Sequence, residues 1–223
     1  MRNSSPLRSA LEPLESRIAP ATLLNSKTIT YTDVDGDAVT ISSNIPAFDS
    51  LTDLTFTTVS DGLEHLDKLV LNSAAQGAVI TIKAKAGASG DGLVNVGYID
   101  ASNVDLKSVT VVGDLGQIDA GDANFNTPAL GSLTVGSLGM FGALYGPTGL
   151  ENVASNFAGN LGSVKILHDL SGASLVATGD GVTAAKIGSV SIGGSMVGSS
   201  TADSGKIQSD GAIGAITVGG SIR

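Results

Sequence analysis

Residues 161–170 read LGSVKILHDL, and the same pattern of apolar residues and glycines recurs four more times in the second half of the chain. At the centre of each copy, two apolar residues flank one polar residue, and most copies have Gly-Ser before this segment and Gly-Gly, Gly-Ser or Gly-Asp after it. A pattern repeated every roughly 20 to 50 residues is typical of repeat architectures. The copies span 106–115, 130–138, 161–170, 187–196 and 213–222, so their first residues are spaced 24, 31, 26 and 26 apart.

The spacing of the central apolar residues predicts short β-strands. Residues two positions apart point to the same face of a strand, and the residue between them faces the other way. We therefore expect an all-β fold in which successive copies pair in parallel as a β-solenoid, with right-handed winding favoured. The inward pairs are Val109/Val111, Leu133/Val135, Val164/Ile166, Val190/Ile192 and Ile216/Val218, and the residues expected to face water between them are Thr110, Thr134, Lys165, Ser191 and Thr217.

The remaining sequence divides into two shorter regions. The solenoid repeats of about 26 residues are expected over 94–223, with further short strands at 174–177 and 206–209. Residues 25–93 are expected to form a β-hairpin and the first strands, as an N-terminal cap region. Residues 1–24 contain three of the six prolines and are expected to form a disordered or weakly helical tail.

The expected hairpin is KTITYTDVDGDAVTI, residues 27–41, and its turn carries Asp33, Asp35 and Asp37. Alternating carboxylates around a glycine offer the hard oxygen ligands that suit Ca²⁺. An EF-hand loop needs a bidentate Glu at its twelfth position, however, and the twelfth residue counted from Asp33 is Asn44. A plain hairpin turn without a bound cofactor is the primary interpretation, and a calcium site is the alternative.

Two segments resemble known exported proteins. The run LEPLESRIAPA, from Leu11 to Ala21, resembles the short N-terminal LEPR-XLL motif of large exported proteins of planctomycetes and verrucomicrobia, although Ser16-Arg17 stands where that motif has Pro-Arg. The repeats resemble the Gly-rich LGSVTIGGDL-type rungs of large exported proteins from the same bacteria. These resemblances imply export and display at the cell surface, and they imply no known reaction.

Composition narrows the range of partners. The net charge is −9, with 17 Asp and only 4 Glu, which argues against binding to nucleic acid or to anionic membrane surfaces. There is no cysteine, so disulfides and thiolate sites are excluded. No stretch approaches the roughly 18 apolar residues that a membrane-spanning helix needs, so we expect no membrane insertion.

Few residues are candidates for catalysis. The two histidines are His65 and His168, and His168-Asp169 stands where the other copies have Gly-Asp, Gly-Ser or Gly-Gly, which favours variation at a corner. The aspartates 114, 119, 122, 169, 180, 203 and 210 do not recur in one register across adjacent copies, so turn formation is their expected role. Between Arg17 and Arg223 there is no arginine to meet an acidic sugar. An ice-binding surface would need a more regular row of threonines than this chain has.

The sequence therefore predicts a non-enzymatic, exported or cell-surface structural or adhesive repeat protein. Its expected partners are other surface proteins or polysaccharide. The last copy, ending near Arg223, has an apolar face and no polar cap in this sequence, so we also expect end-to-end self-association there. The alternative is a polysaccharide-active β-helix enzyme or a fragment of one, and a cleft with convergent carboxylates would favour it.

Overall fold

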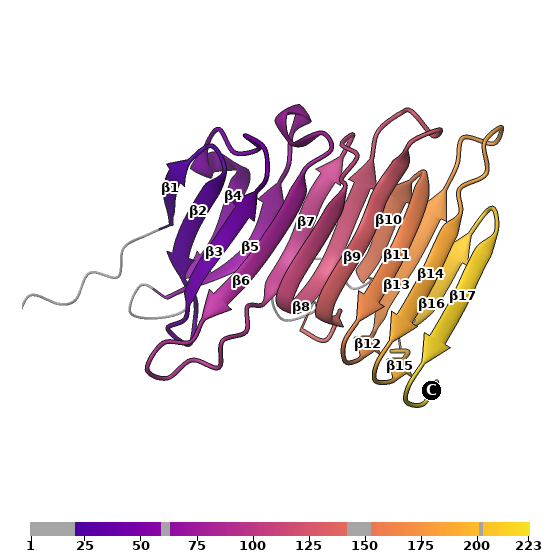
Figure 1. Ribbon diagram of the computed structural model, residues 1–223. Helices are drawn as coiled ribbons and strands as arrows, with labels where there is room; N and C mark the ends of the chain where they lie inside the picture. Colours follow the sequence, from indigo (N-terminus) through magenta and orange to yellow (C-terminus); the bar gives the residue numbers. More distant parts are fainter. Residues whose placement is uncertain (1–20, 59–62, 142–152, 201–202) are drawn as a thin grey trace, which may run out of the picture.

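The computed structural model describes residues 21–58, 63–141, 153–200 and 203–223, and these residues form a long, mostly parallel β-sheet (Figure 1). The described residues contain no α-helix and only two 3₁₀ turns, η1 (Leu51–Asp53) and η2 (Ser73–Ala75). The prediction of an all-β fold is confirmed. The strands are β1 (Thr22–Asn25), β2 (Thr28–Thr32), β3 (Ala38–Ser43), β4 (Leu54–Thr58), β5 (Glu64–Val70), β6 (Val79–Lys85), β7 (Val96–Ser102), β8 (Ser108–Gly121), β9 (Pro128–Leu138), β10 (Val153–Ala158), β11 (Asn160–Ile166), β12 (Leu170–Ser171), β13 (Ala173–Thr178), β14 (Ile187–Ile192), β15 (Met196–Val197), β16 (Lys206–Ser209) and β17 (Ile213–Val218).

The N-terminal strands pair antiparallel. The predicted hairpin is β2 with β3, in which Ile29 faces Ile41 and Tyr31 faces Val39 across the pair. All four of these side chains are buried, as the alternation of apolar and polar residues predicted. Strand β1 pairs antiparallel with β2, β3 with β6, and β4 with β5.

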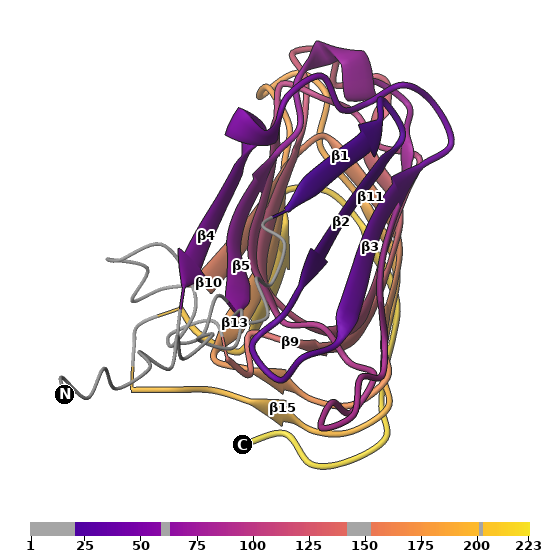
Figure 2. The same ribbon diagram turned by 90° about the vertical axis from the view of Figure 1, so that its left-hand side faces the viewer.

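From β5 and β6 onward the strands pair in parallel, in three stacks. The front stack contains β6, β8, β9, β11, β14 and β17. The back stack contains β5, β7, the end of β8, β10, β13 and β16. The corner stack joins the ends of β8 and β9 to β12 and β15. The chain runs from front to corner to back, then returns to the front stack one strand further along (Figure 2). Parallel pairing thus begins N-terminal to residue 94, earlier than the sequence indicated.

The predicted copies lie in register in the front stack. Leu106 pairs with Leu130, which pairs with Leu161, then Ile187, then Ile213. The predicted inward pairs of the first four copies are all buried, which confirms their orientation. In the last copy Ile216 is 46% exposed, because β17 pairs on one side only, with β14, among the described strands.

Two further predictions from the sequence concern the N-terminal segment and membrane insertion. Apart from Ala21, the whole LEPLESRIAPA segment lies outside the described residues. Within the described part of the chain, no helix has the length and apolar character needed to cross a membrane.

Candidate functional site

The hairpin loop between β2 and β3 brings three carboxylates together. Asp33, Asp35 and Asp37 each have a carboxylate oxygen within 4.8 Å of the others. The loop closes because the Asp37 N–H donates to Asp33 Oδ1 at 2.8 Å and the Gly36 N–H donates to the Asp33 carbonyl. Gly36 has a φ of 92°, a conformation that glycine adopts without strain. All three residues of the sequence-predicted calcium candidate therefore lie in one cluster.

Asp37 is the fully buried member of this cluster, and its carboxylate holds a second loop. Its Oδ1 accepts the Gly87 N–H at 2.7 Å, and its Oδ2 accepts the Gly92 N–H at 2.6 Å. A Cβ on Gly90 would lie 1.4 Å from Asp37 Oδ1, so only glycine fits against this carboxylate. The hydrogen-bonding capacity of Asp37 is therefore directed to the loop 86–95.

Asp33 lies at the centre of the remaining acidic groups. It forms an isolated parallel bridge with Glu64, at the start of β5. Burial, a hydrogen bond with Asp35 and the charges of Asp35 and Asp37 raise the pKa of Asp33 to about 7. Burial also raises the pKa of Glu64, although the Ala21 N–H opposes this by donating to its carboxylate. The site therefore concentrates negative charge in a buried position, which is costly without a compensating cation or proton.

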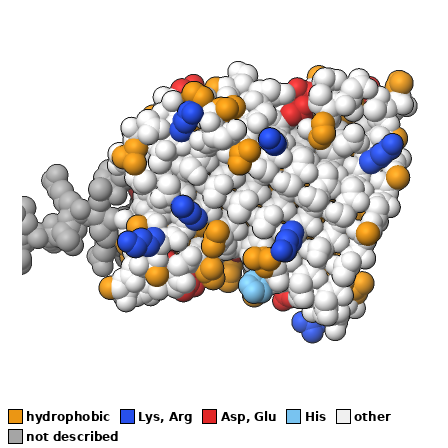
Figure 3. All heavy atoms as spheres, viewed as in Figure 1, with side chains coloured by type: hydrophobic (Ala, Val, Ile, Leu, Met, Phe, Trp, Pro, Cys, Tyr) orange, Lys and Arg blue, Asp and Glu red, His pale blue; other side chains and the backbone are white. Residues whose placement is uncertain are grey.

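A cleft of about 580 Å³ extends from this cluster along the edge where the front stack meets the corner stack. Five aspartates line it: Asp33, Asp35, Asp91, Asp114 and Asp169. Apolar side chains form much of the remaining wall, and no Lys or Arg is among the described lining residues. On the face shown in Figure 3, hydrophobic side chains gather at the lower edge beside a histidine and an acidic side chain, whereas Lys and Arg are scattered singly. The cleft is thus an acidic, partly apolar groove.

Both histidines of the chain line this cleft. His65 is buried, and its Nδ1 lies 3.0 Å from Asp67 Oδ1. Burial lowers the pKa of His65, although Asp67 opposes this shift. His168 is exposed at the corner of its copy, as its position in the repeat predicted. The sequence did not predict that both histidines line one cleft, because they are far apart along the chain.

A column of polar residues runs through the corner beneath the cleft. Asp114 pairs with Ser137 on the next strand, and Asp169 and Ser195 follow at equivalent positions in later copies. The Ser137 hydroxyl and the N–H groups of Met140 and Phe141 all donate to the Asp114 carboxylate. Asp169 Oδ1 likewise accepts the Ser195 N–H at 2.6 Å. Asp114 and Asp169 therefore share one column, with Ser137 between them.

Part of this column was legible in the sequence. In every copy the residue just before the last apolar position is polar: Asp114, Ser137, Asp169, Ser195 and Ser221. Aspartates alone do not recur in adjacent copies, because serine takes this position in the intervening copy and obscures the match. The turn-forming role expected for Asp114 and Asp169 agrees with their hydrogen bonds to the corner backbone.

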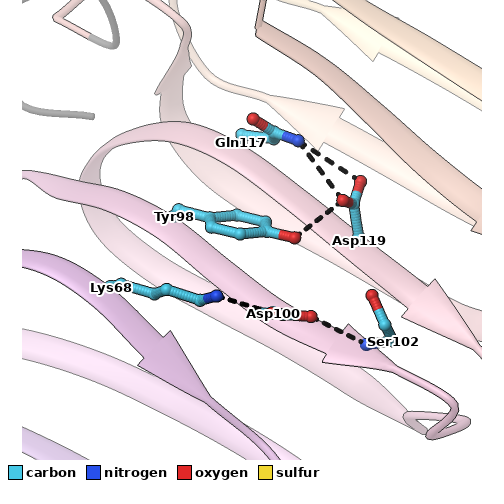
Figure 4. A network of polar contacts seen from close by, with 6 residues as sticks. All are labelled: Lys68, Tyr98, Asp100, Ser102, Gln117 and Asp119. Atoms are coloured by element: carbon cyan, nitrogen blue, oxygen red, sulfur yellow. Dashed lines mark hydrogen bonds and ion pairs between the residues drawn. The ribbon is translucent and has the colours of Figure 1, made fainter. Parts of the chain in front are cut away.

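A separate polar network crosses the back stack (Figure 4). The Tyr98 hydroxyl donates to Asp119 Oδ2 at 2.7 Å, and Lys68 forms an ion pair of 2.7 Å with Asp100. Burial, the hydrogen bond to Asp119 and nearby negative charge raise the pKa of Tyr98. Asp119 Oδ1 also accepts the backbone and side-chain N–H groups of Asn156, on the next strand of the stack. This network links successive strands of the back stack to one another.

No protein-family model, curated protein or solved structure matches this chain. Its function must therefore be inferred from the arrangement of its own residues.

Proposed function

We propose that the chain is a right-handed parallel β-solenoid that serves, outside the cell or on its surface, as a structural or adhesive protein and not as an enzyme. One observation carries this proposal: five copies of one pattern stack in continuous register along the front stack. Each added copy extends the same surface and contacts only its neighbours, as in solenoid proteins generally. Such a scaffold suits a spacer that presents binding surfaces.

Two further features support a surface role. The N-terminal segment and the repeats resemble those of exported bacterial proteins. The acidic cleft supplies a recessed surface on the scaffold, where other surface proteins or polysaccharide could be held. The proposal therefore joins a repetitive scaffold to one distinct groove.

Localisation is tested on cells that produce the protein. Antibodies against residues 21–223 should label intact cells or detect the protein in the medium, and protease added to intact cells should remove the cell-bound signal. A cytoplasmic protein probed in parallel should stay protected. Labelling that appears only after lysis, with nothing in the medium, would show that the protein acts inside the cell.

The cleft favours a second candidate, a polysaccharide-active protein. Glycoside hydrolysis commonly uses two carboxyl groups on either side of the scissile bond, one of which stays protonated as the general acid. Burial raises the pKa of Asp114, although bonds from Ser137, Phe141 and Met140 oppose the shift, and Asp91 and Asp169 line the same cleft. A convergence of carboxylates is the feature expected of this alternative.

The second candidate is tested by the release of new reducing ends from a panel of neutral and acidic polysaccharides. If the cleft is catalytic, Asp114→Asn and Asp169→Asn should each abolish release, whereas Asp203→Asn, at an exposed position, should have no effect. If the wild-type chain binds a polysaccharide but releases no ends, the adhesive proposal stands and the catalytic one is wrong.

A further inference from the structure

The loop cluster has buried oxygen atoms that lack a hydrogen-bond partner. Among the described residues these include the Tyr31 hydroxyl, Asp35 Oδ1 and Glu64 Oε2. All three belong to the segments 31–35 and 64–65, which the bridge between Asp33 and Glu64 holds side by side. Buried polar atoms in native proteins are almost always paired, so unpaired oxygens gathered at one place indicate a missing partner.

The buried, unpaired hydroxyl of Tyr31 is a second observation, independent of the acidic side chains. Its side chain is 4% exposed, and its ring packs edge-on against Phe56 with centroids 5.0 Å apart. Residues two positions apart on a strand point to the same face, and Tyr31, near the end of β2, and Asp33, just after it, are both buried. The unpartnered hydroxyl thus belongs to the same buried face as Asp33, which bridges to Glu64.

A bound cation would pair with the unpartnered oxygens and offset the negative charge gathered there. In the described part of the chain, the ion pairs of Lys and Arg join Lys68 to Asp100 and Lys206 to Asp203, and none involves this cluster. Asp37 already accepts two backbone N–H groups, whereas Asp35 Oδ1 and Glu64 Oε2 have no hydrogen-bond partner among the described residues. An all-oxygen, multiply charged set of this kind is the environment that Ca²⁺ prefers.

We propose that Asp33, Asp35 and Glu64 bind one divalent cation of the calcium type, and that this ion fastens the N-terminal hairpin to β5, at the start of the parallel stacks. Glu64 supplies the further carboxylate that Asn44 cannot provide within the loop. Asp37 holds the loop 86–95 behind the site, and the Tyr31 hydroxyl bonds to a ligand carboxylate or to a water on the ion. This assignment is independent of the proposed surface function.

Terbium(III) is the probe, because it replaces Ca²⁺ at oxygen sites and emits when a nearby tyrosine absorbs light. The chain has three tyrosines and no tryptophan, so the sensitising residue can be identified by substitution. The full chain should give tyrosine-sensitised Tb³⁺ emission that Ca²⁺ displaces. Tyr31→Phe should lose most of this emission but keep the rise in melting temperature produced by Ca²⁺. Tyr98→Phe, in the separate network of the back stack, should keep both.

The ligand assignment is tested by Ca²⁺ titration of two matched variants. Glu64→Gln should weaken Ca²⁺ binding by about tenfold or more, since affinity follows the charge of the ligand set. Asp203→Asn removes one acidic charge at a distant exposed position and should bind as the wild type does. Circular dichroism in EDTA verifies that both variants fold.

Three results would overturn the proposal. One is a wild-type chain that shows neither sensitised emission nor a Ca²⁺-dependent rise in melting temperature at about 1 mM, well above the tighter calcium-site affinities. Another is emission that survives Tyr31→Phe. The third is a folded Glu64→Gln chain that binds Ca²⁺ as tightly as the wild type. If Glu64→Gln does not fold, the Tyr31→Phe comparison decides alone.

Discussion

A Cβ atom on Gly162 would lie 1.9 Å from the carbonyl oxygen of Gly131, its partner on the neighbouring strand of the front stack. The same relationship recurs in the next two copies. A Cβ on Gly188 would lie 2.7 Å from the Gly162 carbonyl oxygen, and a Cβ on Gly214 would lie 1.9 Å from the Gly188 carbonyl oxygen. Each copy after the first therefore needs a glycine at its second position, because the backbone of the preceding copy occupies the space of a side chain. This contact explains why Gly recurs there in four of the five copies.

Replacing Gly162 with alanine should therefore destabilise the chain. The new methyl group would collide with backbone, which cannot rotate away, and overpacking of this kind costs about 1–3 kcal/mol or more. Gly198→Ala is the matched control, since its Cβ would meet nothing closer than 3.7 Å. Urea unfolding should show a clear loss for Gly162→Ala and a change within about 1 kcal/mol for Gly198→Ala. Equal losses would mean that the stacked contact is absent in solution.

The orientation of the strands is tested by placing a charge on either face of β14. Val190 is 1% exposed, so Val190→Asp would bury an unpaired carboxylate at a cost of several kcal/mol. Ser191, next to it, faces solvent, and Ser191→Asp should change the free energy of unfolding by only about 0.5 kcal/mol. Urea melts of the two variants separate the faces. Similar losses in both would show that the assigned register is wrong.

The sequence predicted those features of the fold that depend on local patterns within the repeat. The inward pair Val190/Ile192 and the corner glycines were readable because strand period and repeat period are local patterns. The parallel pairing of β5 and β6 could not be predicted from the sequence. Glu64–Val70 and Val79–Lys85 do not carry the repeat motif, yet they pair with β7 and β8. Hydrogen bonds between backbones impose no sequence signature on such strands.

In the candidate site, too, contacts between residues far apart along the chain could not be predicted from the sequence. Asp33, Asp35 and Asp37 were identified because their spacing within one turn is a known ligand pattern. Glu64 was missed because only the isolated bridge between Asp33, just after β2, and Glu64, at the start of β5, brings the two residues together. The cleft was missed for a related reason: Asp91, Asp114 and Asp169 come from three different passages of the chain, and their convergence depends on how the corners stack.

The ion pair between Lys68 and Asp100 predicts a pH dependence. Burial would raise the pKa of Asp100, but Lys68 and Ser102 outweigh it and lower the pKa below the ordinary value. A carboxylate whose pKa is lower in the folded state stabilises the fold above its unfolded pKa of about 3.9, and this contribution is lost as pH falls through the folded pKa.

Asp100→Asn should accordingly be less stable than the wild type at pH 7, by a modest amount because the pair is partly exposed. The difference between the two chains should shrink as pH falls from about 4 through the lower folded pKa, below which Asp100 is protonated in both states of the wild type. Urea melts at pH 7 and at a strongly acidic pH give the two differences. A difference that does not change with pH would mean that Asn perturbs packing and that the charge of Asp100 contributes nothing.

The last strand of the front stack leaves apolar surface uncovered. Ile213 is 38% exposed, Ile216 46% and Ile222 73%, whereas the equivalent Ile187 and Val190 one copy earlier are each 1% exposed. Strand β17 pairs with β14 on one side, and no described strand lies on the other. An open edge with apolar side chains favours pairing with another chain, and solenoids need polar caps to stay soluble.

We expect this chain to self-associate through β17. Light scattering should give a mass above that of one chain, and a polar capping helix appended after Arg223 should reduce it to the monomer. The same helix placed before Met1 is the control and should leave the association unchanged. A monomer without any cap would contradict the prediction, and association that persists with the C-terminal cap would assign it to a different surface.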